Sequence, residues 1–394
     1  SIGGFTFVVF KTYKMNDMKG KQGMVCMGLL LVLSSCHTGK QITASGLQRK
    51  DFQTEVNGQH TDLFTLSNKQ GMEVCITNYG ARVVSILVPD RNGKRKDVVC
   101  GFSTITEYME QRQNFGSTVG RYIGRILNAR FTLDGVEYKL VPNNGKSGHI
   151  SHGGNPGFAD RIWKVEQADT HRVCLSYLSP DGENGFPGNL KVTLVYSLGE
   201  DDNALDLTYE ATTDAPTVLN LSHHSFFNIS GNFTKSVEDQ QLWVDADRFT
   251  PYDDKKCVTG EYLQVAGTPL DFRMPHAIGE CIDADHPQLK VVNGYDHTWE
   301  LNTKGDDTRP AAWVYDPASG RKMEIFTTEP GMQIYTGNGL KGKMTGKGGI
   351  AYPFRSAVCF ETMHFQDSPN QPGFPSTVLR PGEVFRSHTV YKFE

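Results

Sequence analysis

Hydrophobic and polar residues alternate along many short segments of this chain, as they do in strands that bury one face. The clearest such segments are Lys191–Leu198, Ala204–Thr213, Lys322–Thr328 and Glu383–Phe393. Turn sequences such as Asp134-Gly135 and Asp181-Gly182 separate them. A helical pattern is confined to short stretches such as Ile105–Gln113. The pattern predicts an all-β, antiparallel sandwich with few short helices.

The segment Met15–Cys36 has a different pattern from the rest of the chain. It has a charged start, then an apolar run, and it ends in Leu33-Ser34-Ser35-Cys36. A run of about ten apolar residues is shorter than the roughly 20 that cross a bilayer as a helix, which favours a secretory signal. The ending resembles a bacterial lipobox and predicts cleavage before Cys36 and lipidation of its thiol. An ordinary signal peptide with an incidental cysteine is the alternative.

These features divide the chain into three parts. Residues 1–35 are expected to be removed as an upstream extension and a lipoprotein signal peptide, and residues 36–50 to form a lipidated Cys36 with a polar tether. Residues 51–394 are expected to fold as one β-sandwich domain, because no interior linker or repeat divides them. The implied location is the periplasm. The lipid would sit in the outer membrane of a diderm bacterium, because no Asp follows Cys36.

Charge and cysteine content exclude several classes of function. The chain carries 40 basic and 44 acidic residues, a net charge of −4 that becomes −7 without residues 1–35. Such a surface repels phosphate backbones, and no basic cluster interleaved with aromatics is present, so nucleic-acid binding is excluded. Contact with a membrane is expected only through the N-terminal lipid. The six cysteines that follow Cys36 have no metal-like spacing. We therefore expect neither a metal site nor a disulfide framework.

Two strand-like segments carry residues suited to proton transfer. Adjacent histidines, His223 and His224, lie in the segment Pro216–Asn228, and imidazole exchanges protons near neutral pH. Glu361 interrupts the otherwise apolar segment Ser356–Phe365, where a buried carboxylate would be a base. A purely structural role for the histidines is the alternative.

These residues belong to an ordered series of motifs. The motifs are TNYGA (77–81), GRYIGRI (120–126), HGG (152–154), SPDGENGFPGNL (179–190), NLSHHSFFN (220–228), TPLDFR (268–273), GYDH (294–297), QIYTGN (333–338), CFET (359–362) and NQPGFP (370–375). In this order they closely resemble the motifs of the aldose 1-epimerases, also called galactose mutarotases, and the similarity runs from about Thr65 to the C-terminus. The resemblance implies a galactose mutarotase-like β-supersandwich whose open cleft binds a monosaccharide.

The resemblance also assigns roles to particular residues. His224 takes the place of the family's general acid and Glu361 that of its general base. The chemistry needs Glu361 ionised while His224 is protonated, and Glu361 itself is the obvious candidate for a group that could raise the pKa of the histidine. The positions on which the family binds its sugar are Arg125, His152, Asp271 and Gln333. For Arg125 and Asp271 a structural ion pair is the alternative.

Two departures from the family pattern concern the sugar site. Gly124 stands where many members carry Asn, and Thr298 with Trp299 follows GYDH where Asn-Phe is common. These changes affect hydroxyl preference more than reaction type. Within GYDH, Asp296 and His297 either contact the sugar or hold a turn.

The implied activity is interconversion of the α and β anomers of free aldohexoses such as galactose and glucose, by ring opening and reclosure. The chemistry requires no metal or redox cofactor, and the sequence does not decide whether a structural Ca²⁺ is bound. We expect a monomer. The alternatives are a non-catalytic carbohydrate-binding lipoprotein and a glycosidase using Glu361 and Asp271. The presence of both His224 and Glu361 argues against a non-catalytic binding protein. The histidine-rich setting argues against a glycosidase, because the two carboxylates of a glycosidase do not need it. A related family acting on hexose 6-phosphates would need a basic cluster that the motifs lack.

Overall fold

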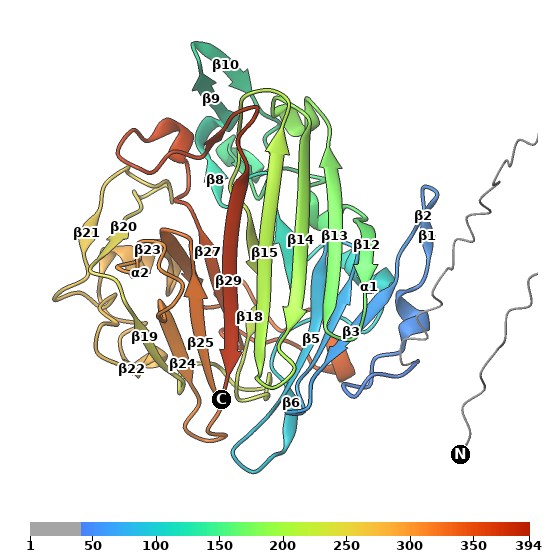
Figure 1. Ribbon diagram of the computed structural model, residues 1–394. Coiled ribbons are helices and arrows are strands. Elements are labelled where there is room, and N and C mark those ends of the chain that lie inside the picture. The colour runs from blue at the N-terminus through green and yellow to red at the C-terminus, as the bar shows by residue number, and fades with distance from the viewer. Residues whose placement is uncertain (1–40) are drawn as a thin grey trace, which may run out of the picture. The chain divides into compact units, whose positions relative to one another are not determined.

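The computed structural model describes residues 41–394, and the predicted signal segment and Cys36 lie outside them. The largest sheet has nine strands, which are all paired antiparallel (Figure 1). In spatial order they are β12 (Lys164–Ala168), β13 (Arg172–Ser179), β14 (Leu190–Leu198), β15 (Ala204–Thr213), β29 (Phe385–Phe393), β25 (Lys322–Thr327), β24 (Ala312–Tyr315), β19 (Gln241–Val244) and β22 (His276–Ala277). The long alternating segments of the sequence therefore form the middle of one broad sheet.

Two smaller antiparallel sheets pack against this one. The first contains β18 (Phe226–Phe227), β27 (Val358–Met363), β26 (Gly331–Tyr335), β23 (Asp296–Glu300), β20 (Arg248–Thr250) and β21 (Leu263–Gln264). The second contains β3 (Leu63–Ser67), β4 (Glu73–Thr77), β5 (Arg82–Pro89) and β6 (Arg95–Asp97). Two-stranded pairs join β1 (Glu55–Val56) to β2 (Gln59–His60), β7 (Ser117–Val119) to β17 (Ser222–His224), β8 (Arg125–Ile126) to β11 (Ile150–Ser151), β9 (Arg130–Leu133) to β10 (Val136–Lys139), and β16 (Thr217–Val218) to β28 (Val378–Leu379).

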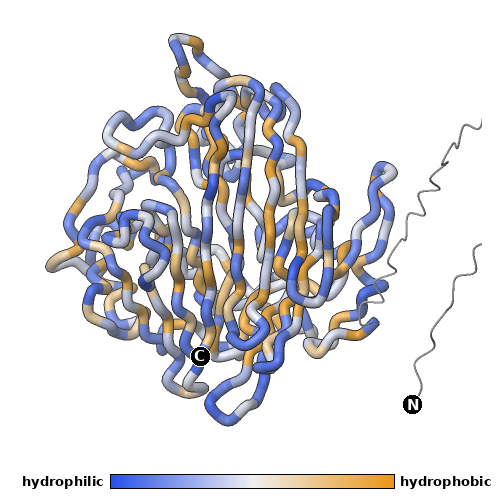
Figure 2. The backbone as a smooth tube through the Cα atoms, in the orientation of Figure 1, coloured by the Kyte–Doolittle hydropathy of each residue, from blue (hydrophilic) through white to orange (hydrophobic). Residues whose placement is uncertain are grey.

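A continuous cluster of buried side chains joins the layers. Leu194 of β14, Ile86 of β5 and Ile334 of β26 all belong to it and are fully buried. Along β14 every second residue is buried, and Figure 2 shows this alternation of hydrophobic and hydrophilic residues along the large sheet. The predicted antiparallel supersandwich is confirmed, because the period of two in the sequence places one face of each strand in this core.

Helices are short in the described part of the chain. The first, α1 (Ile105–Gln111), begins with a capping box in which Thr104 and Glu107 bond each other's backbone. It ends where Arg112 adopts a left-handed conformation with φ 45°. The second, α2 (Pro287–Val292), ends at Asn293, also left-handed. Neither these nor any other described helix is long and apolar enough to cross a membrane.

The folded region begins earlier than the sequence indicated. Residues 41–50 were expected to form part of a polar tether, but Thr43 and Leu47 are buried. The backbone amides of Ala44 and Ser45 donate to the buried carboxylate of Glu73 at 2.7 and 3.2 Å. The domain boundary at residue 51 is therefore wrong. A polar segment packs against the domain here because a buried acceptor satisfies its backbone, which composition cannot reveal.

Candidate active site

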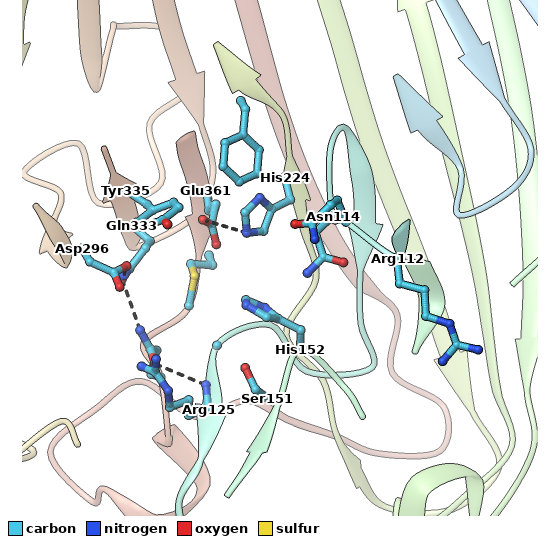
Figure 3. Close-up of a pocket in the computed structure, with 15 residues that line it drawn as sticks. Arg112, Asn114, Arg125, Ser151, His152, His224, Asp296, Gln333, Tyr335 and Glu361 are labelled. Atoms are coloured by element: carbon cyan, nitrogen blue, oxygen red, sulfur yellow. Dashed lines mark hydrogen bonds and ion pairs between the residues drawn. The ribbon is translucent and has the colours of Figure 1, made fainter. Parts of the chain in front are cut away.

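A pocket of about 270 Å³ opens between the β8–β11 pair, β17 and the strands β23, β26 and β27 (Figure 3). It is lined by Arg112, Gln113, Asn114, Gly124, Arg125, Ser151, His152, His224, Phe226, Asp296, Gln333, Tyr335, Glu361, Met363 and Gln366. Five of the six residues that the sequence placed in catalysis or sugar binding are among them. The exception is Asp271.

His224 and Glu361 face each other at the centre of this pocket (Figure 3). His224 ends β17, which pairs with β7, and Glu361 lies in the middle of β27. The Nε2 atom of His224 is 3.3 Å from Oε1 of Glu361, and their side chains are only 7% and 5% exposed. Two strands far apart in sequence therefore bring an imidazole and a carboxyl group within reach of one bound molecule.

The surroundings of the pair change the proton affinity of both groups. Burial raises the pKa of Glu361 well above its ordinary value, and Asp296 adds to this while Arg125 opposes it. Burial lowers the pKa of His224 to about 4, against an opposing contact with its own backbone. An uncharged pair, with the shared proton on Glu361, is therefore favoured in the free protein. Glu361 therefore does not raise the pKa of His224 in the free protein, because removing two charges from water costs more than their attraction returns.

His152 stands beside His224 on the opposite wall. It follows β11 in a left-handed conformation with φ 51°, and its ring centroid lies 5.5 Å from that of His224. Burial, His224 and Arg125 together lower the pKa of His152 to about 3. Its Nδ1 atom is buried and has no hydrogen-bond partner in residues 41–394. A neutral imidazole with an unused nitrogen can accept or donate one hydrogen bond to a ligand hydroxyl.

Polar side chains from neighbouring strands form the wall next to Glu361. Gln333 of β26 is directly opposite Glu361 in the ladder, and its Nε2 donates to Asp296 at 2.7 Å. Its Oε1 accepts from Thr298 at 2.5 Å. Burial raises the pKa of Asp296, while Arg125 acts to lower it. This wall therefore presents an amide, a carboxyl group and a guanidinium, which suit the paired donors and acceptors of sugar hydroxyls.

Asp271 lies elsewhere. Both of its carboxylate oxygens accept from Arg273 at 2.8 Å, and Arg273 also reaches Asp247 at 3.1 Å. The spacing of two residues on one loop lets the arginine fork close on Asp271 locally. The aspartate that does line the pocket, beside Glu361, is Asp296 from the GYDH motif.

The sequence did not single out several other residues of the pocket. Arg112 and Asn114 follow the end of α1, and a charged residue and an amide at a helix terminus carry no signal of a site. The position of Gln366 in the pocket depends on Gly124, where many members of the resembled family carry Asn. A Cβ at residue 124 would lie 2.5 Å from Cγ of Gln366, whose Nε2 donates to the hydroxyl of Tyr252 at 2.7 Å. The absent side chain at 124 makes room for this glutamine.

Comparisons with known proteins agree with this geometry. Residues 62–392 match the family model described as aldose 1-epimerase. The chain is 40% identical over 331 residues to the galactose mutarotase of Bos taurus, covering 84% of this chain and 93% of that protein. It is 36% identical over 339 residues to the aldose 1-epimerase of Escherichia coli strain K12, covering 86% and 96%.

Solved structures give the same result. An aldose epimerase homologue from C. elegans superposes with a TM-score of 0.78 at 31% identity, covering 85% of this chain and 99% of that one. A galactose 1-epimerase from Lactobacillus acidophilus NCFM has a TM-score of 0.75 at 28% identity, with coverages of 86% and 96%. The matched region contains every element that lines the pocket. The chain belongs to the aldose 1-epimerase family.

Proposed function

We propose that this protein interconverts the α and β anomers of free aldohexoses such as galactose and glucose. The observation that carries the proposal is the buried pair of His224 and Glu361, 3.3 Å apart in a polar pocket. Relatives that match most of the chain are named galactose mutarotase and aldose 1-epimerase. The reaction is an isomerisation, so substrate and product have the same composition.

Ring opening needs one proton removed and one supplied. When the shared proton lies on Nε2 of His224, the carboxylate of Glu361 takes the proton of the C1 hydroxyl and the imidazolium protonates the ring oxygen. The C1–O5 bond breaks and an aldehyde forms. Afterwards Glu361 is a carboxylic acid and His224 is neutral, which is the state that burial favours in the free protein.

Reclosure runs the same transfers backwards. Rotation about the C1–C2 bond presents the other face of the aldehyde to the hydroxyl on C5. His224 then takes the proton from that hydroxyl while Glu361 protonates the carbonyl oxygen at C1. The pair returns to its starting protonation state, so it exchanges acid and base roles without a net proton from solvent, and the chemistry requires no cofactor.

The remaining polar residues of the pocket are proposed to hold the sugar. Asp296, Gln333 and Arg125 lie on the Glu361 side and would bind hydroxyls next to C1. His152, with its unpartnered Nδ1, would bind on the His224 side. Fixed donors and acceptors of this kind orient the ring while C1 changes configuration. The glycosidase alternative that paired Glu361 with Asp271 lacks its second carboxylate, since Asp271 does not line the pocket.

Polarimetry of freshly dissolved α-D-glucose and α-D-galactose tests the proposal. Purified protein should speed the approach to equilibrium in proportion to its concentration, after subtraction of buffer-catalysed mutarotation. The final rotation should not change, because an isomerase does not move the equilibrium. Rates equal to buffer alone for both sugars would refute the activity.

We further propose that the mature protein is a periplasmic, lipid-anchored monomer. The support is the sequence Leu33-Ser34-Ser35-Cys36 after a short apolar run. The outer membrane is the proposed site, because no Asp follows Cys36. Lipid attachment at Cys36 would keep the enzyme where free sugars cross the cell envelope.

A further inference from the structure

A thiol lies beside the acid–base pair, and the mechanism above does not use it. Cys359 is fully buried on β27, two residues before Glu361 and therefore on the same face of the strand. Its Sγ atom is 3.6 Å from Nδ1 of His224. His224 thus has Glu361 at one ring nitrogen and Cys359 at the other.

We propose that Cys359 is a positioning residue, whose sulfur accepts the Nδ1–H of His224 and so keeps Nε2 free to exchange a proton with Glu361 and the sugar. This role rests on the proposed mutarotase function. Which nitrogen of a histidine carries the proton is set by the hydrogen bond that the other one makes. In both protonation states of the proposed cycle Nδ1 keeps its proton, so one acceptor there serves every step.

The packing around His224 makes the sulfur its side-chain partner at Nδ1. Phe226 stacks on the imidazole with centroids 5.1 Å apart and planes at 24°, and Phe226 is paired with Cys359 across the β18–β27 ladder. The residue that stacks on the imidazole is therefore also the ladder partner of Cys359, which places the thiol at the ring edge. Besides Glu361 and Cys359, the charged or titratable groups that act on this ring are His152 and Arg82 from other elements and His223 from β17 itself.

A thiol differs from the carboxylate that often orients a catalytic histidine. Sulfur is a weak, uncharged acceptor, so it orients the imidazole without stabilising the imidazolium. The protonated His224 therefore stays a strong acid toward the ring oxygen of the sugar. A carboxylate at residue 359 would hold the proton on His224 and oppose this transfer.

A metal site is the competing interpretation of these three residues. Ligand atoms of His224, Cys359 and Glu361 lie within 4.8 Å of one another. However, Nδ1 of His224 faces the sulfur and Nε2 faces the carboxyl group, so neither ring nitrogen contacts both neighbours. The arrangement fits a hydrogen-bonded relay and not a chelate.

The test compares Cys359→Ala and Cys359→Ser with Cys100→Ala. Cys100 is a buried cysteine of the same hydrophobic cluster, and its side chain does not line the pocket, so its replacement controls for the loss of a buried sulfur. We expect kcat of Cys359→Ala to fall on the order of tenfold with KM within about twofold, since only ring orientation is lost. Cys359→Ser, which keeps an acceptor, should recover part of this loss, and Cys100→Ala should match the wild type.

Nitrogen NMR of the His224 ring provides a readout that simple loss of packing would not change. In the wild type at neutral pH we expect a proton on Nδ1 and none on Nε2, and in Cys359→Ala a mixture of both tautomers. A proton on Nε2 in the wild type overturns the proposal even if Cys359→Ala does not fold. Equal kinetics of Cys359→Ala and Cys100→Ala overturn it too. If the wild type itself shows no mutarotase activity, the proposed function has failed instead.

Discussion

Gln333 and Glu361 are direct partners across the ladder between β26 and β27, and Gln333 in turn donates to Asp296 at 2.7 Å. The register of β26 with β27 therefore places the proposed base, Glu361, next to the polar side chains of Gln333 and Asp296. A shift of one residue would turn Glu361 into the core and remove it from the pocket. The site depends on the ladder as much as on its residues.

Replacing either member of the acid–base pair should remove catalysis before it removes binding. We expect Glu361→Gln and His224→Ala each to slow anomerisation by at least ~10²-fold, the scale of a positioned proton-transfer group. Polarimetry measures the rate, and calorimetry measures the sugar affinity that should partly survive.

Glu329→Gln is the matched control for this experiment. Glu329 is buried and lies 2.7 Å from Nδ1 of His364, a second Glu–His pair, and neither residue lines the pocket. Its variant should keep mutarotase activity. Normal turnover by both Glu361→Gln and His224→Ala would refute the mechanism.

Two aspartates allow a paired test of the sugar site. Asp296→Asn should raise KM by on the order of tenfold, because a charged acceptor for sugar hydroxyls is lost. Asp271→Asn should leave KM unchanged, since Asp271 binds Arg273 outside the pocket. Initial rates over a range of galactose concentrations decide between them. A larger increase in KM for Asp271→Asn than for Asp296→Asn would show that Asp271 binds the sugar, as the sequence indicated.

The pH dependence of kcat/KM should be broad. The active pair of His224 and Glu361 holds one proton. Activity therefore falls at low pH, when the pair gains a second proton near the His224 pKa of about 4, and at high pH, when the pair loses its only proton. The raised pKa of Glu361 moves that second limb to higher pH than an ordinary carboxyl group would allow. We therefore expect kcat/KM to be level above about pH 4 and to fall again only at a pH above the ordinary range of a carboxyl group.

His224→Gln should change the alkaline side of this profile. With only Glu361 left to titrate, activity rises as the carboxyl group ionises and no alkaline limb follows. The measurement must be corrected for buffer-catalysed mutarotation at each pH. A limb that is unchanged in this variant would assign the proton donor to another group, with His152 the nearest candidate.

His388 should stabilise the fold in a pH-dependent way. It is hydrogen-bonded to Asp206 and to Asp307, the latter at 2.6 Å, and these partners raise its pKa to about 9, Asp206 having the larger effect. Because the folded-state pKa lies above the ordinary value of about 6.5, the stabilisation is complete below pH ~6.5 and is lost as pH rises through about 9. The Tm deficit of His388→Gln should thus be larger at pH ~6 than at pH ~10.

A neighbouring ion pair on the same strand controls for this effect. Arg386 of β29 pairs with Glu210 at 2.9 Å, and both side chains are more than half exposed. Arg386→Gln should change Tm little at either pH, since exposed pairs contribute little. A Tm deficit of His388→Gln that stays constant between pH ~6 and ~10 would show that the two hydrogen bonds do not act through the charge of His388.

Lipid attachment can be tested on the full chain in cells. Cys36→Ser should abolish incorporation of a labelled fatty acid and leave a soluble or uncleaved form, because the thiol is the proposed acceptor. Cys257→Ser, at a free cysteine of the folded domain, should be labelled like the wild type. Equal labelling of Cys36→Ser would refute the assignment.

The amino-acid sequence by itself determined the fold class, the family and most of the site. Alternation with a period of two identifies strands and their buried faces, and the ordered motifs identified His224, Glu361, Arg125, His152 and Gln333. It could not separate Asp271 from Asp296, because both are acidic residues in family motifs. The sequence also could not show that residues 41–50 pack against the domain.

Only the tertiary structure decided which of these residues meet. The approach of β17 to β27 brings His224 against Glu361 and Cys359, and the register of β26 with β27 places Gln333 beside Glu361. The pKa directions of the pair were likewise decided there, because burial opposes charge and depends on every neighbouring layer. Periodicity states which face of a strand is buried. It does not state which strands adjoin, and proton affinity follows from that arrangement.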